Sequence, residues 1–381
     1  MENNELRVMF VVASRPNFMK IAPLVHESQK QKIRFSIFYT EQHKSEMMSD
    51  VFFKELKIPK PNFNLGLSSK VKKASKFRKA IAFLTSARYA RNILKKAHPD
   101  LVIVVGDVIS SAYMALIAKS LRIPVAHVEA GLRSFNNKMP EEKSRKLIDR
   151  NSKLLFTTEK SANENLKIEK NKGKVFFVGN IMIDSLIENL KQARKINYYE
   201  KLKLEKKKYA VLTFHRHENL AKRQRVESIL NSLNRITKQI KVVLPLHPNT
   251  RNKLIEFGLI KRLESIKNLE IIKPLGYKDM LSLILDSKFV MTDSGGLQEE
   301  TTYLKIPCLT LRTETERPIT VTIGTNSIVK FNIRKIEKKV DKILKNKYKD
   351  GEIPKLWDGK TACRIMNIIR KEYETKDNSK G

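Results

Sequence analysis

Short runs of apolar, often β-branched residues recur along almost the whole chain, and stretches with helical character separate them. The run LVIVVGD at 101–107 has no polar residue until it ends. A strand of this kind is buried on both faces, which is typical of parallel sheets that helices cover on each side. The alternation therefore predicts an α/β fold built on parallel sheets.

The apolar runs divide into two series, and each series predicts one doubly wound, Rossmann-like domain. The first series lies at 7–13, 35–40, 101–107, 124–129, 154–158 and 175–180, and the second at 209–215, 241–247, 269–275, 289–293 and 307–311. We expect an N-terminal domain at 1–180, a C-terminal domain at 181–355, and a C-terminal helix within 356–381 that packs back on the N-terminal domain. The two domains are expected to face a central cleft.

Composition narrows the class of protein. The 381 residues suit about two domains, and no apolar run reaches the roughly 18 residues of a membrane span. The polar N-terminus does not have the order of a signal peptide, and two cysteines do not suggest a disulfide framework, so we expect a cytoplasmic location. The net charge of +36 could indicate an anionic partner. Because the basic residues are spread along the whole chain, a lysine-rich surface explains the charge better than nucleic-acid binding.

Polar residues follow nearly every predicted strand. Ligands of open parallel sheets bind at the carboxyl ends of the strands. Some of these residues could be ordinary helix caps, but so many at one edge indicate an active site. The residues are Arg15, Asp107, Glu129, His215, His247 and Asp293.

The segment TDSGGLQEETTYL at 292–304 predicts an anion site. Ser294, Gly295 and Gly296 fall where a strand gives way to a helix, and free N–H groups at a helix start favour an anion. Glu300 lies one turn further along the same face, where its carboxylate could accept hydrogen bonds from a sugar. A phosphate beside a ribose indicates a nucleotide. The alternative is a plain strand-to-helix turn with a serine cap.

Three acids and one histidine predict proton transfer. Asp107, Glu129 and Glu141 lie near one sheet edge, and like charges there raise one another's pKa. His215 comes from the second domain, and histidine is the side-chain type that exchanges protons near neutral pH, so the set fits proton abstraction and return. Alternatively, Asp107 is a helix cap and Glu141 is a first-turn charge.

Other chemistries have weaker support. The seven histidines show no metal-ligand spacing, and neither a GxSxG elbow nor a GxGxxG fingerprint occurs where it would be needed. Arg15 suits bidentate contact with a phosphate. Lys20 could join it, although a surface charge is the simpler interpretation of one lysine in this chain.

Several segments together resemble the UDP-N-acetylglucosamine 2-epimerase family, in the right order from about residue 7 to 330. They are SRPNFMKIAPL, HVEAGLRSF, MPEEKSRKL, GNIMIDSL, HRHEN and TDSGGLQEETTYLKIPCLTLRTETERPITVTIGTN. The resemblance implies the GT-B-like arrangement of two Rossmann-like domains. It also implies cofactor-free epimerisation of UDP-N-acetylglucosamine to UDP-N-acetylmannosamine, by elimination of UDP to a 2-acetamidoglucal and its re-addition. A homodimer and a role in polysaccharide biosynthesis are expected with it.

The resemblance also implies roles for residues. Diphosphate contact falls to Arg15 and to Ser294, Gly295 and Gly296, and the ribose to Glu300, with Lys20 and Arg317 also binding substrate. Catalysis falls to Asp107, Glu129, Glu141 and His215, without a fixed division into acid and base. Gln42 and His43 match the pair that holds a second, activating UDP-N-acetylglucosamine in the non-hydrolysing branch, and His247 could join them; a polar loop is the alternative.

Departures from the family pattern keep other activities open. They lie at Ala13, Glu41, Val108, Ile109 and Arg150. A hydrolysing relative would release UDP and N-acetylmannosamine, and a relative acting on a UDP-diacetamido-uronate would look much the same. A glycosyltransferase on this fold, or a protein that only binds a UDP-sugar, would leave the acids unexplained.

Overall fold

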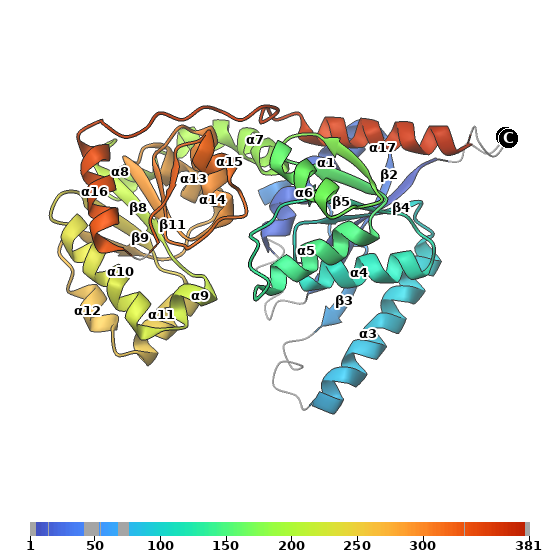
Figure 1. Cartoon of the computed structure of the whole chain (residues 1–381), viewed down its shortest axis with the longest axis horizontal. Helices are drawn as coiled ribbons and strands as arrows, with labels where there is room; N and C mark the ends of the chain where they lie inside the picture. Colours follow the sequence, from blue (N-terminus) through green and yellow to red (C-terminus); the bar gives the residue numbers. More distant parts are fainter. Residues whose placement is uncertain are drawn as a thin grey trace. The chain divides into compact units, whose positions relative to one another are not determined.

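The computed structural model describes residues 5–13, 15–41, 53, 55–67, 76–330 and 332–377, with the backbone alone at 15–16, 41, 66–67, 76–84, 217 and 375–377 (Figure 1). The chain divides into two compact units. The first unit is Met1–Ser185 together with Lys355–Gly381, and the second is Leu186–Pro354.

The first unit is built on a seven-stranded sheet in the order β3-β2-β1-β4-β5-β6-β7. Every pairing in it is parallel. The strands are β1 Arg7–Val12, β2 Arg34–Glu41, β3 Phe63–Leu67, β4 Leu101–Val105, β5 Val125–Ala130, β6 Leu154–Thr157 and β7 Lys174–Phe177. Strands β4 and β5 are buried along their whole length, as unbroken apolar runs predict. The six strands expected from the sequence are confirmed, and β3 is an additional edge strand.

Helices join these strands and cover the sheet. They are α1 Arg15–Lys30, α3 Lys76–Ala97, α4 Ile109–Ser120, α5 Pro140–Asn151 and α6 Lys160–Ile168, followed by α7 Ile181–Ile196, which runs on into the second unit. The last helix, α17 Thr361–Asp377, returns to the first unit and lies beside α1 (Figure 1). Its Asn367 accepts a hydrogen bond of 2.8 Å from Gln31, which directly follows α1, and the backbone N–H of Ala362 donates to Asp184 at 2.7 Å.

The second unit repeats the plan with a six-stranded sheet in the order β10-β9-β8-β11-β12-β13. Its strands are β8 Tyr209–Thr213, β9 Lys241–Pro245, β10 Leu269–Ile272, β11 Phe289–Thr292, β12 Cys308–Thr310 and β13 Asn326–Ile328. Its helices are α8 Tyr198–Lys201, α9 His217–Leu220, α10 Arg223–Ile236, α11 Pro248–Glu256, α12 Ile260–Glu264, α13 Tyr277–Leu285, α14 Gly295–Tyr303, α15 Ile319–Thr322 and α16 Ile333–Leu344. The five expected strands are confirmed, and β13 is additional.

The strand orders locate the candidate site. In each sheet the chain winds outward in both directions from one pair of neighbouring strands, β1 and β4 in the first unit and β8 and β11 in the second. Ligands of doubly wound sheets bind at the carboxyl ends of such a pair. The predicted fold class, two doubly wound Rossmann-like domains, is confirmed. Among the described helices, none is long and apolar enough to cross a membrane.

Candidate active site

At the switch point of the first unit, side chains of α1 pack closely against Gly106. This residue follows β4 and has a φ of +74°, a conformation that favours glycine. A Cβ atom at this position would lie 3.4 Å from both the amide nitrogen of Asn17 and Nζ of Lys20. Asn17 also donates a hydrogen bond of 2.8 Å to the carbonyl of Val105. Helix α1 therefore packs its polar side chains directly against the end of β4.

Lys20 pairs with Glu129 at this point. Its Nζ lies 2.6 Å from Oε2 of Glu129, and both residues are buried. Glu129 has a φ of +71°, and the pairing of β5 with β6 shifts register between Val128 and Ala130. A non-glycine residue in this region is uncommon and marks a locally constrained backbone. Lys20 is therefore a buried residue paired at the end of β5, and its interpretation as a surface charge is wrong.

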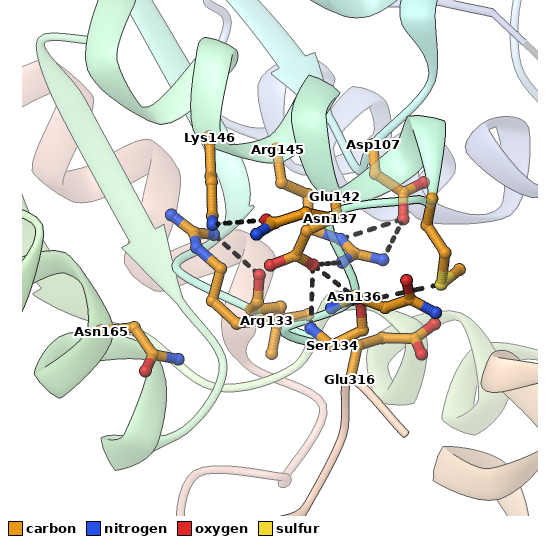
Figure 2. Close-up of polar contacts among 12 residues, drawn as sticks. Asp107, Arg133, Ser134, Asn136, Asn137, Glu142, Arg145, Lys146, Asn165 and Glu316 are labelled. Carbon is orange, nitrogen blue, oxygen red and sulfur yellow. Dashed lines mark hydrogen bonds and ion pairs between the residues drawn. The ribbon is translucent and has the colours of Figure 1, made fainter. Parts of the chain in front are cut away.

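Asp107 is held by an arginine from α5. Nε and Nη2 of Arg145 donate to Oδ2 of Asp107 at 3.1 and 2.7 Å, while Nη1 donates to Oε2 of Glu142 at 2.7 Å. The same Glu142 oxygen accepts hydrogen bonds from the backbone N–H and the hydroxyl of Ser134, both at 2.9 Å. Figure 2 shows the guanidinium of Arg145 between the two carboxylates. Val108, not Asp107, occupies the N-cap position of α4, so Asp107 is no helix cap.

Glu141 lies in the first turn of α5, where its side chain is exposed, whereas the adjacent Glu142 is fully buried. The sequence suggested that the acids of this edge raise one another's pKa. In the structure Asp107 and Glu129 each have a cation of their own, Arg145 and Lys20.

Among the other predicted residues, Gln42 and His43 lie outside the described part of the chain, and Arg15 is described by its backbone alone, at the start of α1.

In the second unit Asp293 organises the switch point. This fully buried residue follows β11, and its Oδ2 accepts the backbone N–H groups of His215 and Arg216 at 3.0 and 2.9 Å and the amide of Asn219 at 2.8 Å. The ring nitrogen Nδ1 of His215 lies 3.4 Å from Oδ1 of Asp293. Asp293 thus fixes the segment after β8 and orients the exposed histidine ring.

His247 lies beside His215. The two rings are 5.8 Å apart between centroids. His247 is the N-cap of α11, and its Nδ1 accepts a hydrogen bond of 3.2 Å from the backbone N–H of Asn249. The end of β9 therefore places this predicted residue next to the predicted catalytic histidine.

The segment from Ser294 to Gly296 starts helix α14. Ser294 is its N-cap, and its side chain makes no capping hydrogen bond. A Cβ atom on Gly295 would lie 2.8 Å from Nη1 of Arg317 and 3.3 Å from Oε1 of Glu316. The glycine therefore makes room for the guanidinium of Arg317, which approaches the first turn of the helix closely.

Arg317 belongs to a largely buried cluster of charges, formed by Arg216, Arg312 and Arg317 with Glu218, Glu299 and Glu316. Glu316 lies 2.8 Å from Arg312, 2.8 Å from Arg317 and 3.4 Å from Arg216, and Arg317 also lies 2.6 Å from Glu299. Nε and Nη2 of Arg312 are buried and have no hydrogen-bond partner among the described residues. Arg216 also lies 3.9 Å from Glu218, so three arginines face three glutamates. The N–H groups at the start of α14 favour an anion beside the guanidinium of Arg317.

Glu300 lies further along α14 and is buried. Its Oε1 accepts a hydrogen bond of 3.0 Å from the hydroxyl of Tyr277. Burial raises the pKa of the Glu300 carboxyl to about 7, with a further contribution from the charge of Glu299, while the bond from Tyr277 acts in the opposite direction. A carboxyl group with this pKa changes charge near neutral pH.

Several residues of these networks did not stand out in the sequence. They lie in helices or loops, whereas many of the predicted residues were found at the ends of strands. They are Asn17, Arg145, Glu142, Tyr277, Arg312 and Glu316. Arg145 follows Glu141 by four residues on one helix, so helical spacing could have suggested it. Asp293 ends a predicted strand, but the number of groups that it holds depends on the tertiary structure.

Comparisons with known proteins identify relatives of this arrangement. A family model described as UDP-N-acetylglucosamine 2-epimerase matches residues 26–370. The UDP-N-acetylglucosamine 2-epimerase of Methanocaldococcus jannaschii is 37% identical over 373 residues, which cover 96% of this chain and 99% of that protein. A crystal structure of the M. jannaschii enzyme in complex with UDP-GlcNAc and UDP has a TM-score of 0.85 at 36% identity, covering 96% of this chain and 100% of that one.

A relative with a different named substrate also matches. The UDP-2,3-diacetamido-2,3-dideoxy-D-glucuronate 2-epimerase of Pseudomonas aeruginosa is 36% identical over 331 residues, which cover 85% of this chain and 88% of that protein. The family model nevertheless spans most of the chain, and the archaeal relative matches along nearly its whole length. The chain belongs to the UDP-N-acetylglucosamine 2-epimerase family.

Proposed function

We propose that this protein interconverts UDP-N-acetylglucosamine and UDP-N-acetylmannosamine without a cofactor, by elimination and re-addition of UDP. The observation that carries the proposal is the pair of acids at the switch point of the first unit, Asp107 and Glu129, each oriented by its own cation. A protein that only binds a nucleotide sugar has no need of such groups. The named activity of the full-length relatives supplies the substrate.

The second unit provides the nucleotide site in this proposal. The backbone N–H groups at Ser294, Gly295 and Gly296 and the guanidinium of Arg317 bind the diphosphate, because a helix start and a guanidinium both favour phosphate. Glu300 accepts hydrogen bonds from the ribose hydroxyls. Arg15, at the start of α1 in the first unit, is a further diphosphate ligand.

The chemistry proceeds in two halves. A base removes the proton at C2, the C1–O bond breaks, UDP leaves with the electron pair, and the 2-acetamidoglucal remains. In the second half UDP adds back to C1 and a proton is delivered to the opposite face of C2. The C2 proton is weakly acidic, so a positioned base is needed, and the departing diphosphate needs cations and N–H groups around it.

Four residues are proposed for the proton transfers: Asp107, Glu129, Glu141 and His215. Lys20 and Arg145 keep Glu129 and Asp107 in fixed orientations, and Asp293 does the same for the His215 backbone. Glu141 is exposed at the start of α5, which leaves its carboxylate open to substrate. Gln42, His43 and His247 are proposed for a second, activating UDP-N-acetylglucosamine, and a homodimer is proposed as the assembly.

Proton NMR in deuterated water with UDP-N-acetylglucosamine tests the proposal. We expect deuterium at C2 and accumulation of UDP-N-acetylmannosamine to equilibrium. Release of UDP with free N-acetylmannosamine would identify the hydrolysing reaction instead. Turnover of the diacetamido-uronate, with none of UDP-N-acetylglucosamine, would assign the chain to the substrate of the P. aeruginosa relative.

The variant Glu141→Gln tests the catalytic assignment within the same assay. Loss of a general acid or base lowers a rate by about 10²–10⁴-fold. Glu264→Gln, an exposed glutamate in α12, is the matched control and should keep the parent rate. If Glu141→Gln exchanges C2 as fast as the parent, Glu141 is not the acid or base.

A further inference from the structure

The first unit contains a fully buried histidine near its predicted catalytic acids. His127 belongs to β5 and is two residues before Glu129. Its Nδ1 lies 2.6 Å from Oδ1 of Asp149, and its Nε2 lies 2.8 Å from the carbonyl oxygen of Gly106. The proton transfers proposed above do not use this residue. Its two contacts nevertheless join α5 to the turn that carries Asp107.

The partners of His127 determine its protonation. A carbonyl oxygen only accepts hydrogen bonds, and so does an ionised carboxylate, so both ring nitrogens must carry hydrogen if Asp149 is ionised. Burial by itself would raise the pKa of the Asp149 carboxyl, but the charges and hydrogen bonds of His127 and Arg133 outweigh burial and hold this pKa below its usual value. The pair is therefore an imidazolium and a carboxylate.

The surrounding charges balance within the same cluster. Nη2 of Arg133 lies 2.7 Å from Oδ2 of Asp149 and 2.6 Å from Oε2 of Glu169, and Nε of Arg133 donates to Oε1 of Glu169 at 2.8 Å. Two cations thus face two carboxylates. A buried network of this kind is stable only when its members are paired and hydrogen-bonded, which makes its geometry specific.

Asp149 contacts residues on both sides of Glu129, the side chain of His127 and the backbone of Gly131. One of its oxygens takes the ring of His127, and the other accepts the backbone N–H of Gly131 at 3.2 Å. Between them Glu129 has its left-handed φ of +71°, at the register shift of β5. The carboxylate of Asp149 thus links His127 to Gly131, and the constrained backbone between them carries Glu129, whose side chain pairs with Lys20.

His127 helps to attach the turn before Asp107 to strand β5. The carbonyl of Gly106 accepts the Nε2–H of His127, and the N–H of Gly106 donates to the carbonyl of Val128 at 3.1 Å. The turn before Asp107 is thereby attached to β5 through both of its backbone polar groups. Asp149 itself lies in α5, the helix that carries Glu141 in its first turn.

We propose that Asp149 and His127 form a positioning pair, a buried carboxylate and imidazolium that set the orientation of Asp107 and Glu129 relative to α5. The inference rests on the proposed function for its activity readout. Neither residue contacts substrate in this proposal. The pair acts through the Gly106 turn and the backbone around Glu129.

Nitrogen-15 NMR of the histidine rings tests the charge state, independently of any activity. With the seven histidines labelled and His127 assigned through His127→Gln, both of its ring nitrogens should carry hydrogen at neutral pH, because each faces an acceptor oxygen. A singly protonated ring at neutral pH would overturn the ion pair. This result stands even if the substrate is not UDP-N-acetylglucosamine.

Kinetics test the positioning role. Asp149→Ala should lower kcat for C2 exchange by about 10–100-fold, the usual effect of losing a partner that orients a functional group, with KM and UDP affinity within about twofold. Asp149→Asn should recover most of the rate, because an amide can donate to a neutral His127 and still accept from Gly131. Glu169→Gln is the matched control, since it also takes a carboxylate from Arg133 but does not contact His127 or Gly131. It should keep the parent kcat.

Two results would overturn the positioning role. One is an Asp149→Ala protein that keeps the parent kcat. The other is a Glu169→Gln protein that loses as much kcat as Asp149→Ala, since a general loss of packing would then explain both. If Asp149→Ala does not fold, Asp149→Asn decides, and an Asn variant that folds and binds UDP but has no exchange activity contradicts the proposed rescue. Absence of exchange in the parent protein, with UDP still bound, would instead count against the proposed function.

Discussion

Nζ of Lys20 lies 2.6 Å from Oε2 of Glu129, and this buried pair joins α1 to the end of β5. Lys20 also approaches Gly106, the turn that precedes Asp107. One lysine therefore contacts or closely approaches the ends of β4 and β5, which carry two of the three predicted acids. The contact makes its ammonium group a structural part of the site.

Replacing Lys20 by methionine should destabilise the fold and remove the activity. Methionine fills a similar volume but leaves the Glu129 carboxylate buried without its cation, and breaking a buried pair in this way costs about 3–5 kcal/mol. The free energy of unfolding in urea measures the loss. Lys30→Met is the control, because Lys30 is exposed and lies 3.9 Å from Glu27 in a surface pair worth about 0–1 kcal/mol. Equal stability of the two variants would contradict a buried, charged Glu129.

Replacing Arg145 by lysine should lower kcat and leave UDP affinity unchanged. The guanidinium bonds Asp107 through Nε and Nη2 and Glu142 through Nη1, and a lysine ammonium cannot reproduce this fork. We expect a loss of about 10–100-fold, as for other partners that orient functional groups. The residues proposed for UDP lie chiefly in the second unit, so a calorimetric titration with UDP should give the parent affinity.

Arg150→Lys provides the control for that substitution. It makes the same chemical change on the same helix, but Arg150 is exposed near the end of α5. Its kcat should match that of the parent. If Arg145→Lys also keeps the parent kcat, the orientation of Asp107 does not depend on the bidentate contact.

The sequence predicted most of the fold, and the two strands that it did not predict, β3 and β13, show which strands are hard to recognise. Buried parallel strands are long apolar runs that stand out from the sequence. Strand β3, FNLGL, lies at an edge and alternates polar with apolar residues, and β13, NSI, is only three residues long with two polar ones. Neither strand is a continuous apolar run, so tertiary pairing rather than local sequence defines them.

The site was predictable at the strand ends but less so in its partners. Asp107, Glu129 and Asp293 each follow or end a strand, which the topology of open sheets makes informative. Their partners Lys20 and Arg145 are on helices, among the 76 lysines and arginines of the chain. The family resemblance indicates Lys20, and the local signal for Arg145 is its four-residue spacing from Glu141. Pairings such as these depend on how helices pack against the sheet, which the sequence alone did not give.

The stability of the protein should depend on pH through Glu300. Its folded pKa is raised to about 7 from 4.5, so between these values the folded state holds a proton that the unfolded state releases. The contribution of this group is complete below about pH 4.5 and is lost as pH rises through about 7. The full contribution of Glu300 to the free energy of unfolding is about 3 kcal/mol. Glu300→Gln removes the titration and keeps an acceptor for Tyr277, so its unfolding free energy should decline less between pH 5 and pH 8 than that of the parent. Parallel pH profiles for parent and variant would rule out a raised pKa at Glu300.

Adding a methyl group at Gly295 should weaken UDP binding without unfolding the second unit. The Cβ atom of alanine would lie 2.8 Å from Nη1 of Arg317, closer than side-chain carbons are found, so the guanidinium must move away from the start of α14. Its bonds to Glu299 and Glu316 would be distorted, and the proposed diphosphate site would lose a cation and gain bulk. Because alanine favours helix more than glycine does, the helix itself should not be weakened. Calorimetry should give a UDP dissociation constant raised by about tenfold or more, the effect of one lost charge-assisted contact of about 1.5–3 kcal/mol, at a melting temperature close to that of the parent. A variant with unchanged UDP affinity would show that the diphosphate does not bind at the Gly295–Arg317 contact.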